Sequence, residues 1–226
     1  MKVRAARHAD VAAMLDVKHA LRLDPARPAG GGFLLGASAD TYAWYVRHAH
    51  VHVLEDGDGA IGGFAVALPD PVLRAGEVWA RRREIAWEGG GWDALEAARV
   101  GYFDQLAVRP RRRFRVYAAV LAASALRALV DGGHQHVFAT VVREPVRNLA
   151  SLPLLAAAGA RRIGQIDETY PEVGRILSDV YHLAAGPGTV DRLLAATPLG
   201  RRVGAMLARA AGELAPTWPA GPGAPC

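Results

Sequence analysis

One stretch of the chain, residues 101–142, constrains the fold more than any other segment. GYFDQLAV predicts a buried strand, VYAAVLAASALRALVDGG predicts a helix that ends at a glycine pair, and HVFATVV predicts a second strand. A strand–helix–strand crossover places its two strands parallel in one sheet, with a right-handed connection. We therefore expect residues 102–108 and 137–142 to be neighbouring parallel strands, joined by a helix at about residues 116–131.

The N-terminal third predicts elements that extend this sheet. Val3–Ala5 is typical of a short strand, and VAAMLDVKHAL has the apolar spacing of a helix packed on a sheet. Ser38 or Asp40 is expected to cap a helix over TYAWYVRHA. Residues 51–68 predict a hairpin, because two apolar strands flank an Asp-Gly turn.

The segments after this hairpin differ in how clearly their apolar pattern indicates a helix or a strand. Residues 69–100 mix charge with Trp79 and Trp87 and show no clean period, so we expect an insertion that borders a site. EPVRNLASLPLLAAAGA predicts a short helix that stops at Gly159, and RRIGQID and ILSDVYHLA predict the last two strands, with DETYPE as a loop. The element order is that of a mixed α/β domain.

The sequence changes character at residue 186. TVDRLLAATPLGRRVGAMLARAAGEL predicts amphipathic helices interrupted at Pro198, and the remaining residues are rich in Pro, Gly and Ala. We expect a main domain over residues 1–185, an accessory helical segment over 186–214 and a disordered tail over 215–226.

Charge and cysteine content narrow the function. The net charge of +5 permits nucleic-acid binding, but no zinc-finger, recognition-helix or aromatic-strand motif accompanies it, so a nucleic-acid partner is not expected. Cys226 is the single cysteine, which excludes an intrachain disulfide and a cysteine-rich metal site, and we expect no metal. The charged start and the lack of a long apolar segment predict a cytoplasmic protein without a membrane partner.

Two motifs give the chain a family likeness. LAVRPRRRFRVYAAVLAASAL is similar to a strand–Val-x-Pro-x-x-Arg/Gln-x-x-Gly-x-Gly/Ala–helix signature, and VREPVRNLASLPLLAAAGARRIG is similar to an Asn-x-x-(Ala/Ser) helix followed by a glycine turn. Over about residues 2–183 the chain resembles the GCN5-related N-acetyltransferases, the GNAT superfamily. The resemblance implies a mostly antiparallel mixed sheet, central parallel strands that splay apart, and helices on both faces, followed here by a C-terminal helical extension.

The resemblance also implies an activity. It is the direct transfer of an acyl group from acetyl-CoA or another acyl-CoA to an amine of a small molecule or peptide. Two alternatives stay open: a donor that is an acyl carrier protein or carries a longer acyl chain, and a non-catalytic GNAT-like binding module. A homodimer also stays open.

In the family, the first motif binds the pyrophosphate of coenzyme A, through backbone N–H groups at a helix N-terminus. Carried over, Arg113 is the first loop position, and Phe114, Val116 and Ala118 stand where glycine, glycine and glycine or alanine are usual. The arginines of the loop can compensate for the missing glycines through side-chain contacts to phosphate, and a solvated basic loop is the structural alternative. The candidates for donor binding are Leu106, Ala107, Val108, Arg113, Phe114, Arg115, Val116, Tyr117, Ala118, Asn148 and Ser151.

The resemblance also suggests catalytic residues. Asp104 lies on the first strand of the crossover and is the candidate general base, with Glu84 as a weaker rival and strand-edge solvation as the structural alternative. Leu155 stands where many members have a tyrosine acid, so Tyr170 is the candidate acid, with a surface-loop tyrosine as the alternative. His134 and His136 are expected to be structural. The candidates for an acceptor cleft are residues 31–36, Tyr42, Trp44, Tyr45, Trp79 and Trp87.

Overall fold

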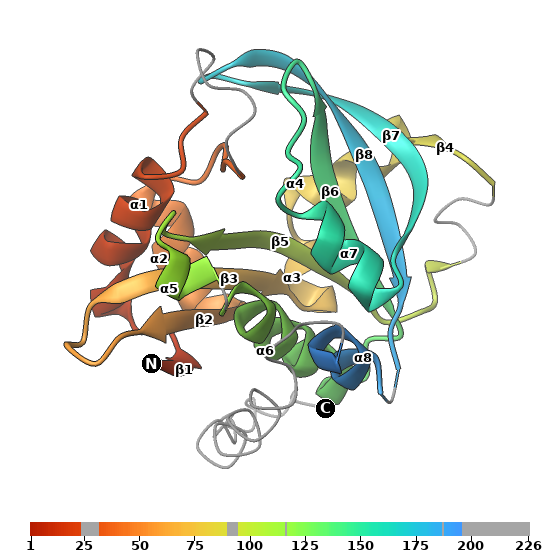
Figure 1. The fold of residues 1–226 in the computed structure, drawn as a ribbon. Coiled ribbons are helices and arrows are strands. Elements are labelled where there is room, and N and C mark those ends of the chain that lie inside the picture. Colours follow the sequence, from red (N-terminus) through yellow and green to blue (C-terminus); the bar gives the residue numbers. More distant parts are fainter. Residues whose placement is uncertain (24–31, 90–94, 116, 187, 196–226) are drawn as a thin grey trace, which may run out of the picture.

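The computed structural model describes residues 1–23, 32–89, 95–115, 117–186 and 188–195, and of Arg112 and Arg113 it describes the backbone alone. Within these residues a single eight-stranded sheet carries helices on both faces (Figure 1). The predicted mixed α/β class is therefore confirmed.

The sheet is antiparallel except at one central junction. Its strand order is β1-β2-β3-β5-β6-β8-β7-β4, and β5 and β6 are the pair that runs parallel. The predicted hairpin at residues 51–68 is β2 and β3, and the two last predicted strands pair as β7 and β8. The strands are β1 (Lys2–Ala5), β2 (His50–Glu55), β3 (Ile61–Leu68), β4 (Ala86–Trp87), β5 (Val100–Val108), β6 (His136–Glu144), β7 (Arg161–Tyr170) and β8 (Gly174–Ala184).

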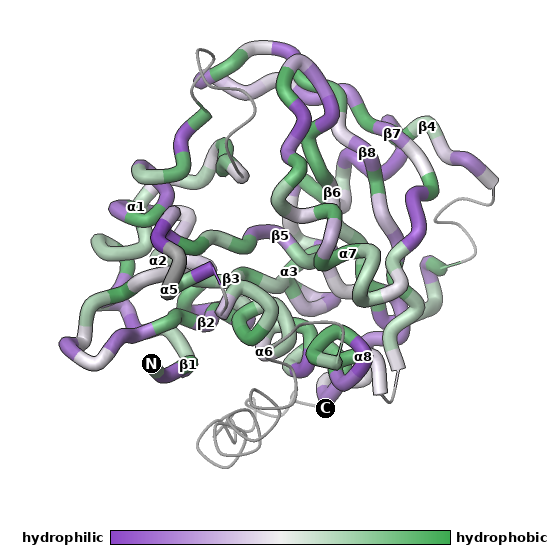
Figure 2. The backbone as a smooth tube through the Cα atoms, in the orientation of Figure 1, coloured by the Kyte–Doolittle hydropathy of each residue, from purple (hydrophilic) through white to green (hydrophobic). Residues whose placement is uncertain are grey.

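The helices divide between the two faces of the sheet. Apolar side chains of α6 and α8 pack in one core cluster, and those of α1, α2, α3 and α4 pack in the other. Figure 2 shows that α6 is mostly hydrophobic, as expected for a helix pressed against a sheet. The helices are η1 (His8–Asp10), α1 (Val11–His19), α2 (Ala39–His48), α3 (Asp70–Arg74), α4 (Glu77–Ala80), η2 (Arg81–Glu84), α5 (Arg112–Arg115), α6 (Ala118–Asp131), α7 (Leu152–Ala158) and α8 (Thr189–Ala195).

Two predicted helices begin later than expected. The crossover helix α6 begins at Ala118, because the arginine-rich loop forms its own helical turn, α5, before it. Helix α7 begins at Leu152, whereas the sequence suggested a start near Pro145. Pro153 occupies the first turn, where its missing N–H needs no partner. Gly159 ends α7 in the left-handed conformation, at φ +85°, as predicted.

The insertion and the last hairpin also depart in detail from the sequence-based expectation. Residues 70–87 form α3, α4, η2 and the edge strand β4, which pairs with β7. Tyr170 is the last residue of β7 rather than part of a loop. The strand continues through DETY because β8 offers partners up to Gly174.

Part of the C-terminal segment is described. Helix α8 buries Val190, Leu193 and Leu194 in the core cluster beside α6. The remainder of the predicted accessory segment, residues 187 and 196–214, and the predicted tail over 215–226 lie outside the described residues.

Candidate active site

The separation of β5 from β6 shapes the centre of the molecule. The two strands pair only where Val100, Gly101 and Tyr102 face residues 136–138, although both strands continue for several residues beyond this point. The prediction of neighbouring parallel strands that splay apart is confirmed. Beyond Tyr102 the edges of β5 and β6 that face each other no longer form a ladder. Their backbone groups are therefore open to other partners.

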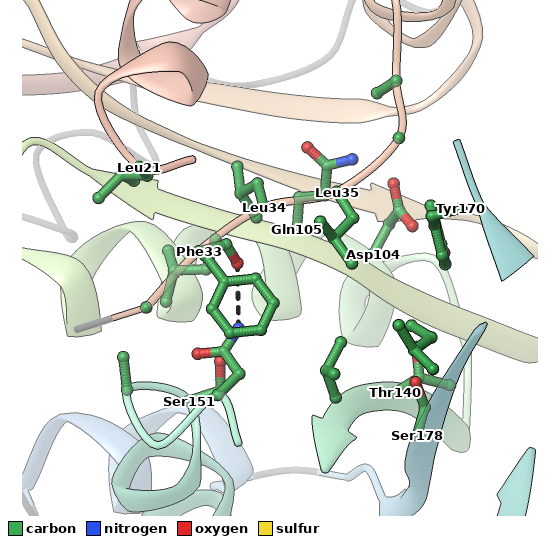
Figure 3. A pocket seen from close by; sticks show the side chains of 18 of the residues that line it. Leu21, Phe33, Leu34, Leu35, Asp104, Gln105, Thr140, Ser151, Tyr170 and Ser178 are labelled. Atoms are coloured by element: carbon green, nitrogen blue, oxygen red, sulfur yellow. Dashed lines mark hydrogen bonds between the residues drawn. The ribbon is translucent and has the colours of Figure 1, made fainter. Parts of the chain in front are cut away.

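A cavity of about 830 Å³ lies at this separation (Figure 3). Leu106 and Val108 in its wall pack with the α6 core, whereas Tyr102 and Ile166 in its wall belong to the α1 core. The cavity is thus lined from both faces of the sheet.

A β-bulge on β5 brings Asp104 into this cavity. Gln105 pairs with Val66 and Phe103 pairs with Ala67, so Asp104 is the extra residue between them. A bulge interrupts the alternation of side chains along a strand. Asp104 and Gln105 therefore both line the cavity, and Gln105 accepts a hydrogen bond of 2.7 Å from the hydroxyl of Tyr42.

Asp104 has the electrostatics of a general base. Its Oδ2 atom is buried and has no hydrogen-bond partner among the described residues. Burial, together with the charge of Glu168, raises the pKa of Asp104 to about 6, against the hydrogen bonds of Tyr45 and Gln105, which lower it. A carboxylate with this pKa is ionised at neutral pH and still accepts a proton readily.

The structure separates Asp104 from its rival. Glu84 is 58% exposed and forms an ion pair with Arg81 at 3.0 Å, outside the cavity wall. Glu168, which sequence reasoning missed, does line the cavity and accepts a hydrogen bond of 2.8 Å from Ser178. The sequence predicts a loop over DETYPE, whereas β7 continues through Glu168 and turns this side chain towards the cavity.

Tyr170 also lies at the cavity, near Asp104 (Figure 3). Burial, together with the charges of Glu168 and Asp104, raises the pKa of Tyr170 above its usual range. The ring packs against Gly36, where an added Cβ would lie 3.0 Å from the Tyr170 ring. Tyr170 is therefore held between the sheet and the loop at residues 32–37.

This loop is fastened across the cavity at both ends. Lys18 donates hydrogen bonds to the carbonyl oxygens of Gly36 and Ala37, and the Gly36 N–H donates to Glu172 at 3.1 Å. At the other end, the Asn148 side-chain amide donates to the Phe33 carbonyl at 3.0 Å (Figure 3). The loop thus spans from α7 to the β7–β8 turn. Residues 31–36 were expected to line an acceptor cleft. Residues 32–36, the described part of this range, line the cavity.

Alternate side chains of β5, the strand expected to run along the donor, face the cavity. Leu106 and Val108 line the cavity, whereas Ala107 points the other way and is 1% exposed. This is the alternation of a strand, whose successive residues face opposite sides of the sheet. The donor contact expected along residues 106–108 is a backbone contact, so it does not depend on the Ala107 side chain and stays a prediction.

Phe114 in the arginine-rich loop is a core residue rather than a wall of the site. Its side chain is 2% exposed and lies over Gly62 of β3, where an added Cβ would be 2.2 Å from the ring. The amides of Phe114 and Arg115 donate to the Arg111 carbonyl at 2.9 and 3.2 Å, and the Tyr117 amide donates to the Phe114 carbonyl. These three N–H groups are occupied within the loop.

Other residues of the loop reach the cavity. Arg115 and Ala118 line it, whereas the side chain of Tyr117 packs against the α6 core. The side chain of Arg113 and all of Val116 lie outside the described residues. This end of the cavity therefore presents a cationic side chain beside the start of α6.

Asn148 and Ser151 lie together in the cavity wall before α7. The Asn148 Oδ1 atom is buried and has no hydrogen-bond partner among the described residues. Ser151 is the N-cap residue of α7, but its side chain makes no capping hydrogen bond. Two polar groups at this position are therefore available to a ligand.

The remaining candidates are mostly structural. His134 links the Leu129 carbonyl to the Asp70 amide, and His136 stacks on His182, as expected for structural histidines. Of the aromatic acceptor candidates, Tyr45 lines the cavity. Tyr42 is fully buried, Trp44 lies beside His48, Trp79 lies under Arg74 and Arg82, and Trp87 contacts Phe138.

The described part of the chain offers neither a metal-binding cluster nor a membrane-spanning helix. Its histidine, cysteine, aspartate and glutamate side chains nowhere gather in threes in a way that would hold a metal ion. None of its helices combines the length and the apolar character that crossing a membrane requires.

Comparison with known proteins relates this fold to solved structures. No family model and no curated protein matches the chain. A ribosomal-protein-alanine N-acetyltransferase from Brucella melitensis superposes with a TM-score of 0.54 at 14% identity, covering 82% of this chain and 100% of the other. A GCN5-related N-acetyltransferase from Kribbella flavida gives 0.53 at 19% identity, covering 81% and 97%.

A third match is a GNAT-superfamily phosphinothricin acetyltransferase from Sinorhizobium meliloti, in complex with AcCoA. It gives a TM-score of 0.53 at 15% identity and covers 82% of this chain and 88% of the other. The matches span almost the whole length of the other proteins and agree in fold. The chain therefore has the fold of the GCN5-related N-acetyltransferases.

Proposed function

We propose that the protein is an N-acyltransferase that transfers an acyl group directly from an acyl-CoA to an amine. The observation that carries this proposal is the position of Asp104, a carboxylate with a buried, unsatisfied oxygen in a cavity lined from both faces of the sheet. The N-acetyltransferases that share the fold, one of them in complex with AcCoA, support the choice of reaction and donor.

The donor enters, in this proposal, from the side of α5, α6 and α7. Arg115 meets the pyrophosphate, and the N-terminus of α6 at Ala118 adds its positive end. The unbonded Oδ1 of Asn148 and the hydroxyl of Ser151 fit the amide and thiol groups of the pantetheine arm. The arm itself takes the place along Leu106–Val108 that β6 leaves open after Tyr102.

The chemistry requires a neutral amine, a polarised carbonyl and a proton for the leaving sulfur. Asp104 accepts a proton from the ammonium group of the acceptor, directly or through a water molecule. The amine then forms the new C–N bond while backbone N–H groups at the separated strands stabilise the developing oxyanion. The C–S bond breaks, and the proton held by Asp104 passes to the sulfur. The nitrogen loses its second proton to water as the amide forms.

Tyr170 is proposed to donate a hydrogen bond to the departing sulfur. Its raised pKa keeps the hydroxyl protonated, and a thiol ionises near pH ~8.5, so complete proton transfer from this tyrosine is unfavourable. Its role is therefore to stabilise the thiolate until the proton arrives.

The acceptor enters on the α1 side, below the loop at residues 32–37. The wall there combines Asp104 and Glu168 with apolar side chains such as Leu34 and Ile166. The Asp104 carboxylate favours an ammonium group, whereas Glu168 is already paired with Arg81 at 3.4 Å. The apolar wall favours a hydrocarbon substituent on the amine. We propose an amine of a small molecule or a peptide as the acceptor.

Calorimetric titration with coenzyme A tests the proposal. We expect saturable binding of one coenzyme A per chain, and release of free thiol from acyl-CoA once a suitable amine is present. The Asp104→Asn variant should bind coenzyme A like the wild type but release thiol about a hundredfold more slowly. Absence of coenzyme A binding by the folded wild-type protein would refute the assignment.

A further inference from the structure

A second, smaller cavity adjoins the candidate active site. It has a volume of about 90 Å³ and lies on the α6 side of the sheet, between β5, β6 and β8 and the helices α6, α7 and α8. Its wall is formed mainly by apolar side chains, among them Phe103, Leu126, Val137 and Leu155. An apolar cavity of this kind holds hydrocarbon better than it holds water.

Small side chains create this space. Ala122 of α6, Ala139 of β6 and Ala158 of α7 all line it, and all three are buried. A larger aliphatic residue at any of these positions would fill the cavity. Protein interiors are otherwise densely packed, so a space bounded by three buried alanines on three elements is a specific feature of this sequence.

The two cavities meet at the separation of β5 and β6. Both are lined by Asp104, Leu106, Phe138, Thr140, Ser151 and Leu154. The polar members of this set lie at the junction, whereas the interior of the small cavity is apolar. A group that extends from the reacting carbonyl into the small cavity must therefore be a hydrocarbon.

We propose that the small cavity receives the tail of the donor's acyl group, so that the preferred donor carries an acyl chain longer than acetyl. This inference rests on the proposed function, because it assumes that the thioester lies beside Asp104. The amide groups of the pantetheine arm would find few hydrogen-bond partners in this cavity, so the arm is not its occupant. A volume of about 90 Å³ corresponds to roughly three water-sized groups, which points to chains of about four to six carbons.

Titration calorimetry with coenzyme A, acetyl-CoA, butyryl-CoA and hexanoyl-CoA tests the inference on the full chain without any acceptor. Each methylene that enters the cavity should raise the affinity about fourfold, from about 0.8 kcal/mol per buried methylene. We expect butyryl-CoA, with two more methylenes, to bind about fifteenfold more tightly than acetyl-CoA. Equal affinities, or tightest binding of acetyl-CoA, would overturn the inference and leave the proposed function intact. No binding of any of the four would instead overturn the proposed function.

Two alanine-to-leucine variants of α7 test whether the gain in affinity for longer acyl chains comes from the small cavity. Ala158→Leu fills the cavity and should abolish the gain from acetyl to butyryl, whereas Ala156→Leu on the exposed side of the same helix should keep it. If Ala158→Leu remains folded and loses affinity equally for coenzyme A and all acyl donors, the cavity holds the donor's arm and the inference is wrong.

If Ala158→Leu does not fold, Leu155→Ala serves instead, because it enlarges the cavity. The acyl-chain length that binds most tightly should then increase, and an unchanged preferred length would count against the inference.

Discussion

The ring of Phe114 occupies the space that a side chain at position 62 would need. A Cβ added at Gly62 would lie only 2.2 Å from this ring. Phe114 stands in the loop where the family resemblance suggests glycine, and Gly62 lies on β3. The absence of a side chain at Gly62 therefore allows a bulky residue in the loop without loss of the fold. The loop between β5 and α6 is anchored in the core by this contact.

This contact predicts the effects of substitutions on stability. Phe114→Ala should lower the free energy of unfolding by about 3–5 kcal/mol, because it empties a fully buried position. Gly62→Ala should lower it by about 1–3 kcal/mol through overpacking. Gly57→Ala is the control, because an added Cβ there meets nothing within 4 Å. Urea unfolding measures all three, and a Gly62→Ala protein as stable as Gly57→Ala would contradict the packing argument.

Asp104 predicts the pH dependence of catalysis. With a pKa of about 6, the carboxylate must be ionised to accept a proton, so kcat/KM should rise as the pH increases through about 6 and then level off. Asp104→Asn should remove this limb of the profile together with most of the activity. Glu84→Gln, which changes a carboxylate outside the cavity, should leave the profile unchanged. A profile of wild-type shape in Asp104→Asn would exclude Asp104 as the base.

The same pKa predicts an effect on stability with a definite sign. The Asp104 carboxyl has a pKa of about 6 in the folded protein and 3.8 as an ordinary aspartate, so it binds protons more readily when the chain is folded. Its contribution is therefore most favourable below pH 3.8 and is lost as the pH rises through about 6. Asp104→Asn should be more stable than the wild type at about pH 7.5, and the difference should shrink towards about pH 4. Chemical unfolding at several pH values checks this, and a variant less stable than the wild type at the higher pH would refute it.

The position of Arg115 in the cavity wall leads to a prediction about coenzyme A affinity. Arg115 lines the cavity, and the loss of a charge-assisted phosphate contact costs about 1.5–3 kcal/mol, or about ten- to a hundredfold in affinity. Arg115→Ala should weaken coenzyme A binding by that factor. Arg109→Ala serves as the control, because the Arg109 side chain donates to the Ile61 carbonyl instead. Calorimetry that shows equal affinities for both variants would remove Arg115 from the binding site.

The buried side chains of α8 lead to a prediction about the stability of chains shortened at the C-terminus. A chain that ends at Gly186 loses the burial of Val190, Leu193 and Leu194, which should cost about 4 kcal/mol or more of stability. A chain that ends at Ala195 retains these contacts and is the comparison. Thermal unfolding of the two truncated proteins separates them. Equal melting temperatures would show that α8 is an accessory segment, as its sequence alone suggests.

The site shows where sequence patterns were informative. The crossover and the hairpin were predicted from the residues, because periodicity and glycine turns are local properties and a crossover has a fixed hand. The separation of β5 from β6 was expected from the family resemblance, which also made Asp104 a candidate on the first strand of the crossover. Glu168 was missed, because its strand extends beyond the apolar pattern and gains its partners only from β8.

By itself, the sequence determined the order of the elements, the parallel pair at the centre of the sheet and the carboxylate on its first strand. Only the tertiary structure decided which side chains of those strands face the cavity, since the bulge at Asp104 shifts the alternation that a pattern assumes. Tertiary packing also placed Phe114 over Gly62 and left a space between Ala122, Ala139 and Ala158. These relationships join residues far apart in the chain, and they depend on how volumes fit together in three dimensions, which a linear pattern does not encode.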